Sequence, residues 1–142
     1  LGMGIVLAQL GRADEAGAFY GRSVAARPDA LAYNNLGAWY EQRGNHGEAE
    51  EAFRRAIELK PHLAQAHDNL GILYARRGES ERAIEAFRMA LKYDPKSCKA
   101  AVNLGAALRQ SGRLDEARQE WLHAVQRDPA CETAARALAS AP

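Results

Sequence analysis

The sequence predicts an all-α solenoid, a stack of antiparallel helix pairs in which each pair packs on its neighbours. One pattern recurs three times along the 142 residues: Leu-Gly, then Ala-x-x-x-aromatic, then Pro. Its glycines, Gly37, Gly71 and Gly105, lie 34 residues apart. Within each copy the apolar residues have the spacing of one helical face. A fixed period with side-chain size preserved at several positions is the sequence signature of a repeat solenoid.

The first helix of each copy, helix A, is recognised by its packing face. In the first full copy this face holds, at i, i+3, i+4 and i+7, the residues Tyr33, Leu36, Gly37 and Tyr40. Such spacing places the side chains on one side of a helix. Gly44 then follows a polar helix end, as expected for a C-terminal glycine stop. The equivalent glycines of the next two copies are Gly78 and Gly112.

The second helix, helix B, carries Ala49, Phe53 and Ala56 at i, i+4 and i+7. Pro61 closes it, because proline cannot continue a helix. Small residues at Gly37 and Ala49 let the two helices approach closely, and the large ring fills the space where repeats meet. The later copies carry Phe87 and Trp121 at the ring position and Pro95 and Pro129 at the end of helix B.

The register of these copies divides the chain into repeats. We expect a partial repeat over 1–29, full repeats over 30–63, 64–97 and 98–131, and a C-terminal capping helix and tail over 132–142. The capping helix itself is predicted from Glu132 to Ser140, because its polar residues suit the exposed end of a stack.

Charge and hydropathy argue against two classes of partner. The 19 basic and 18 acidic residues give a formal net charge of +1, too little to hold a phosphate backbone. No apolar run approaches the roughly 18 residues that span a bilayer. We therefore expect no nucleic acid and no direct membrane insertion.

Two cysteines, Cys98 and Cys131, lie about one repeat apart. Stacked repeats place equivalent positions about 10 Å apart, beyond the limit of about 7 Å between Cα atoms joined by a disulfide. We therefore expect free thiols, which fit a reducing compartment and favour a cytoplasmic location.

These motifs resemble the tetratricopeptide repeat (TPR) family, whose pattern has the same residues at the same spacing. The resemblance covers nearly the whole chain and departs from the family mildly: His67 and Ala101 replace an aromatic residue, and Leu108 replaces a tyrosine. It implies a right-handed superhelix whose A helices line a concave groove that binds peptides. It also implies a non-catalytic adaptor or scaffold.

Helix geometry assigns the residues that point away from the packing face of each A helix to this groove. The expected groove residues are Asn34, Asn35, Asp68, Asn69, Ile72, Arg76, Lys99, Val102, Asn103 and Arg109. The column of Asn35, Asn69 and Asn103 could pair with the N–H and C=O groups of an extended peptide. It resembles the ladder lining the TPR superhelix of O-linked N-acetylglucosamine transferases. Alternatively, the asparagines bond neighbouring repeats to one another.

The remaining groove residues are apolar or basic. Ile72 and Val102 mark a binding surface, or else they are buried between adjacent A helices. The basic residues Arg76, Lys99 and Arg109 favour a ligand with acidic character, or else form a solvated face. Only two of the five positions of the clamp that binds chaperone tails are filled in this chain, so we expect no tight binding of such tails.

No catalytic, metal-binding or cofactor-binding pattern accompanies the repeats, and no enzyme activity or cofactor is expected. His67 occupies a packing position rather than a ligand position. Two alternatives to a peptide-binding adaptor remain open. The chain is the substrate-recruiting arm of a larger enzyme such as a glycosyltransferase, or it self-assembles through an open N-terminal edge formed by Leu1, Met3 and Ile5.

Overall fold

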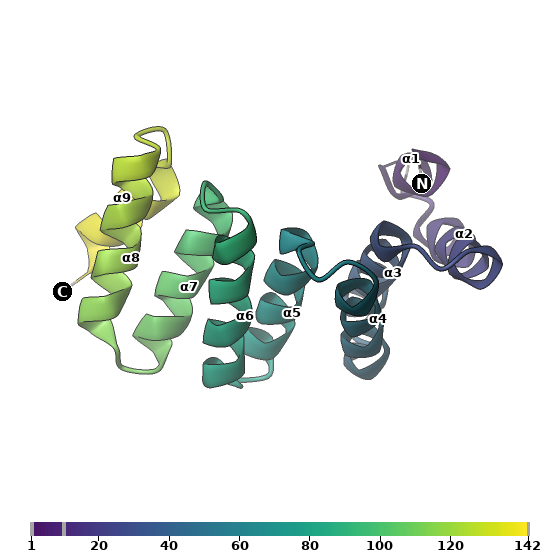
Figure 1. The fold of residues 1–142 in the computed structure, drawn as a ribbon, viewed down its shortest axis with the longest axis horizontal. Helices are drawn as coiled ribbons and strands as arrows, with labels where there is room; N and C mark the ends of the chain where they lie inside the picture. The colour runs from purple at the N-terminus through teal and green to yellow at the C-terminus, as the bar shows by residue number, and fades with distance from the viewer. Residues whose placement is uncertain (1, 10, 142) are drawn as a thin grey trace. The chain divides into compact units, whose positions relative to one another are not determined.

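The fold is that of a computed structural model, which describes residues 2–9 and 11–141. Over these residues the chain forms nine α-helices and no strand, which confirms the predicted all-α class (Figure 1). The helices are α1 (Gly2–Gln9), α2 (Ala13–Ala26), α3 (Ala30–Gln42), α4 (His46–Leu59), α5 (Ala64–Arg76), α6 (Ser80–Tyr93), α7 (Cys98–Gln110), α8 (Leu114–Arg127) and α9 (Glu132–Ser140). The chain divides into two compact units, unit 1 (Leu1–Asn69) and unit 2 (Leu70–Pro142), and the boundary falls within α5.

The close approach of α3 and α4 in unit 1 depends on Gly37. A Cβ atom there would lie 2.7 Å from the ring of Phe53, which is fully buried. In unit 2 the ring of Phe87 covers Gly71 in the same way. The large rings were expected where repeats meet, and both Phe53 and Phe87 also lie over the glycine of their own helix pair. The small residue therefore makes room for the ring as well as for the neighbouring helix.

Local signals begin and end these helices as their chemistry predicts. Asp29 accepts a hydrogen bond from the amide of Ala32 at 2.9 Å, and Ser97 accepts one from Ala100 at 3.2 Å, so both side chains cap their helices. The glycines expected to stop the A helices all have positive φ, as a left-handed helix end requires. Their φ angles are 77° at Gly44, 75° at Gly78 and 83° at Gly112.

Two apolar clusters hold unit 1 together. One contains Ala16, Tyr20 and Leu36, and the other contains Ala30, Ala56, Leu63 and Ala66. The imidazole of His67 is buried, and its Nε2 lies 2.8 Å from the carbonyl oxygen of Pro61. This contact confirms the packing position predicted for the histidine.

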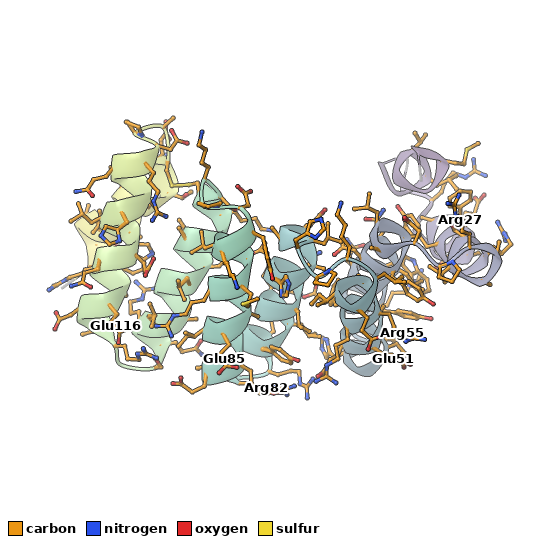
Figure 2. The ribbon with its side chains drawn as sticks, in the orientation of Figure 1. Arg27, Glu51, Arg55, Arg82, Glu85 and Glu116 are labelled. Atoms are coloured by element: carbon orange, nitrogen blue, oxygen red, sulfur yellow. A yellow bond between two sulfur atoms is a disulfide. The ribbon has the colours of Figure 1, made fainter. Side chains whose placement is uncertain are left out.

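In unit 2, ion pairs join α6 to α8 and to the N-cap residue of α8, Arg113. Arg88 lies 3.3 Å from Glu116, and Arg113 lies 3.5 Å from Glu81. Figure 2 shows Glu116 on α8, with Arg82 and Glu85 on α6. The hydrogen bond from Arg113 lowers the pKa of Glu116 below its ordinary value. These groups are exposed, so their pairing adds little to stability.

A disulfide joins Cys98 and Cys131, and the expectation of free thiols is wrong. The two Cα atoms lie 5.7 Å apart, within disulfide reach. The expectation treated the cysteines as equivalent positions, but their separation is 33 residues, one less than the repeat. Cys98 is the first residue of α7 and Cys131 is the N-cap of α9. Two helices whose axes are a full packing distance apart can therefore still meet at their N-terminal ends.

Only part of the predicted N-terminal edge falls within the described chain. Leu1 and the side chain of Ile5 lie outside the described residues. Met3 is 62% exposed and Val6 is 48% exposed, so α1 presents apolar side chains to solvent. Within the part of the chain that the structure describes, no helix has the length and apolar character needed to cross a bilayer.

Candidate peptide-binding site

The clearest candidate site in unit 2 is a hollow of about 180 Å³ between α5 and α7, which we call the α5–α7 hollow. Its lining residues are Ile72, Ala75, Arg76, Phe87, Asn103, Ala106, Ala107 and Gln110. Three of the predicted groove residues therefore come together here: Ile72, Arg76 and Asn103. Ile72 and Asn103 are half-buried and Arg76 is exposed, so both apolar and polar groups reach the opening.

The floor of this hollow follows from the repeat pattern. Phe87 on α6 reaches the hollow, since Gly71 on α5 has no side chain to separate them. A Cβ at Gly71 would lie 2.6 Å from the phenyl ring. Ala75 and Ala106 are too small to fill the space above, so it stays open.

The predicted basic residues are all at the surface. Arg76 and Arg109 lie in the last turns of α5 and α7, and Lys99 lies near the start of α7. The guanidinium of Arg109 lies 5.7 Å from the ring centroid of Trp121. A cation over an aromatic face is partly held in place. Of these three side chains only Arg76 lines the hollow.

Unit 1 contradicts two of the predicted groove positions. Asn34 is 0% exposed and Asp68 is 6% exposed, so neither presents a side chain to a ligand. The prediction considered only the contact between each A helix and the B helix of its own repeat. An A helix in a stack also contacts the adjacent A helix, and this second contact buries a wider arc of its surface.

In unit 2 the predicted groove residue Val102 is half-buried, and its carbonyl oxygen accepts a hydrogen bond from the Trp121 indole at 3.4 Å.

One member of the asparagine column, Asn69, bonds a neighbouring repeat. The Nδ2 of Asn69 donates to the Oδ1 of Asn34 at 3.0 Å, so here an asparagine bonds one repeat to the next. The Nδ2 of Asn34 is buried and has no hydrogen-bond partner. Asn35 and Asn103 are half-buried, and Asn103 lines the α5–α7 hollow. The alternative that the asparagines bond neighbouring repeats is therefore correct for Asn69.

Phe87 and Ala107 line the hollow, although neither is among the expected groove residues. Phe87 has the pattern of a core residue, and it is indeed almost fully buried. The sequence signal that could have identified Phe87 is Gly71, because a glycine there lets the phenyl ring lie directly against α5. Among the described residues, no group of His, Cys, Asp and Glu side chains could hold a metal ion.

The fold and this site define a class of protein, the helical-repeat modules that bind other proteins. Two sequence profiles of the tetratricopeptide repeat match the chain, one over residues 1–62 and the other over residues 69–131. The chain therefore belongs to the tetratricopeptide repeat family, as its repeated motifs predict. This family typically supplies a non-catalytic interaction fold.

Solved structures agree with this membership. Two crystal structures of MamA are 28% identical to the chain and match 91% of it, with TM-scores of 0.83 and 0.84. The matched regions cover 71% and 76% of those MamA chains. A comparison with curated proteins gave no significant match.

Proposed function

We propose that this chain is an interaction module whose A helices bind an extended peptide segment of a partner protein. The observation that carries the proposal is the α5–α7 hollow, where three residues selected from the repeat register line one opening. An apolar floor with a few polar groups at its edge is the usual character of a binding site. The half-buried amides of Asn35 and Asn103 would form hydrogen bonds with N–H and C=O groups of the peptide backbone, whatever side chains the peptide carries.

A peptide chosen by the protein itself provides the test. A 12-residue peptide would be selected from a random display library on the immobilised chain, and its Kd measured by calorimetry. The double substitution Asn35→Ala/Asn103→Ala should weaken binding roughly tenfold, since each lost hydrogen bond contributes about 0.5–1.5 kcal/mol. Asn69 is left intact because its amide bonds Asn34.

The matched control is Gln119→Ala/Gln126→Ala, which removes two exposed amides from α8. This control should bind the peptide as the wild-type chain does. Equal affinity of the asparagine double variant and the control, with both folded by circular dichroism, would contradict a role for the A-helix amides.

A second candidate function is self-association through α1. The observation that favours it is the exposure of Met3 and Val6 on this helix. Sedimentation of the wild-type chain should then show a concentration-dependent increase in mass that Met3→Glu/Val6→Glu abolishes. A monomer at every concentration would eliminate this candidate. The alternative of an enzyme's recruiting arm stays open, and no residue of the chain requires it.

A further inference from the structure

The α5–α7 hollow has a definite size and a chemically divided lining. Its volume of about 180 Å³ slightly exceeds the roughly 150 Å³ of an apolar cavity that holds benzene. It can therefore take one aromatic or branched aliphatic side chain. The apolar groups that would contact this side chain are Ile72, Ala75, Phe87, Ala106 and Ala107.

The polar lining lies mainly at one end of the hollow. Arg76 and Gln110 are the last residues of α5 and α7, and Arg109 precedes Gln110. Lys99 lies ten residues before Arg109, about 15 Å away along the helix. None of the lining residues is acidic. Arg76, the basic residue of the lining, would attract a carboxylate at this end of the hollow.

From this arrangement we infer the chemistry of the peptide: one bulky apolar side chain fills the α5–α7 hollow, and an adjacent acidic residue pairs with Arg76. The amide of Asn103, three residues before Ala106 on α7, meets the peptide backbone. The inference rests on the proposed function and assigns a ligand class to the same site. An apolar side chain supplies most of the affinity by burial, and the acid supplies direction and specificity.

Synthetic heptapeptides test the ligand class directly. The reference peptides are Ac-Ser-Gly-Phe-Asp-Glu-Ser-Gly-amide and its isomer with Asp-Glu before Phe. Replacing Phe by Ser should weaken the better of the two roughly tenfold or more, the equivalent of burying one large side chain. Replacing Asp-Glu by Asn-Gln should weaken it roughly two- to fivefold, as for an exposed ion pair, and should remove its salt dependence.

Matched protein variants locate the contact. Ala106→Leu fills the hollow from an exposed position, and Ala38→Leu makes the same change at the equivalent position of α3. Ala106→Leu should lower the affinity for the Phe peptide to the value that the wild-type chain has for the Ser peptide. Ala38→Leu should leave the affinity for the Phe peptide unchanged. Arg76→Gln should abolish the preference for Asp-Glu over Asn-Gln, and Arg118→Gln on α8 should keep it.

Four results would overturn the inference, and they separate it from the proposed function. Equal binding of all heptapeptides, or no effect of Ala106→Leu, would eliminate the hollow as the contact while leaving groove binding intact. Binding of the display-selected peptide but of no heptapeptide at millimolar concentration would eliminate the ligand class alone. Failure of the display selection as well would eliminate both.

Discussion

The disulfide between Cys98 and Cys131 should hold the C-terminal helix in place. Within this helix only Ala134 is buried, and Ala137 and Leu138 are half-buried. The bond closes a loop with a sequence separation of 33 residues. In the chain-entropy relation, a loop of this length stabilises the folded state by about 3.7 kcal/mol at 25 °C. This exceeds what burial of one alanine methyl group provides, which is about 0.8 kcal/mol.

Reduction is the perturbation, and thermal unfolding followed by circular dichroism is the assay. A loss of 1 kcal/mol lowers the Tm of a chain of this size by about 3 °C, so reduction should lower it by roughly 10 °C. Hydrogen exchange should lose protection first in α9, Glu132–Ser140. The variant Cys98→Ser/Cys131→Ser should melt like the reduced wild-type chain and should not respond to reductant.

Two results would refute this reasoning. An unchanged Tm after complete reduction, verified by titration of two free thiols, would show that the bond does not stabilise α9. Free thiols in the protein before any reductant is added would show that the bond does not form.

Three further predictions concern the packing of the helices. Asn69→Ala should cost about 1–3 kcal/mol, because it leaves the buried Asn34 amide without its partner, and Gln119→Ala at an exposed position of α8 should cost less; urea unfolding compares them. Gly37→Ala should destabilise the folded chain by about 1–3 kcal/mol, because the new methyl group clashes with the Phe53 ring. Gly21→Ala has open space around it and should stabilise the folded chain by about 0.5–1 kcal/mol. A change of the same sign for both variants would contradict the packing argument. Glu116 has a lowered pKa, so its contribution is present above its unfolded pKa and is lost as pH falls; the Tm difference between wild type and Glu116→Gln should disappear in acid and in high salt.

The sequence predicted the parts of this fold that depend on local chemistry. The positive φ of Gly44, Gly78 and Gly112 and the extent of α9 follow from residues within a few positions of one another. The close approach over Gly37 was also predictable, because side-chain size repeats with the period. The division into repeats stays a prediction, since the compact units are divided at Asn69 and Leu70 rather than at a repeat boundary.

The candidate site was only partly predictable because its members depend on two neighbours at once. A helical wheel with one packing partner placed Asn34 and Asp68 on an open face, but the structure buries both. The same wheel did identify Ile72, Arg76 and Asn103, which line the hollow. The disulfide was missed for a related reason: a mean helix spacing does not give the distance between two helix ends.

The most direct test of ligand binding by the A helices is an amide chemical-shift titration of the ¹⁵N-labelled chain with the display-selected peptide. We predict that the largest shifts fall on the faces of α5 and α7 that line the hollow, at Ile72, Arg76, Asn103 and Gln110. If the largest shifts instead fall on exposed residues of the B helices, at Arg54, Arg88 and Arg118, they would contradict the proposed function.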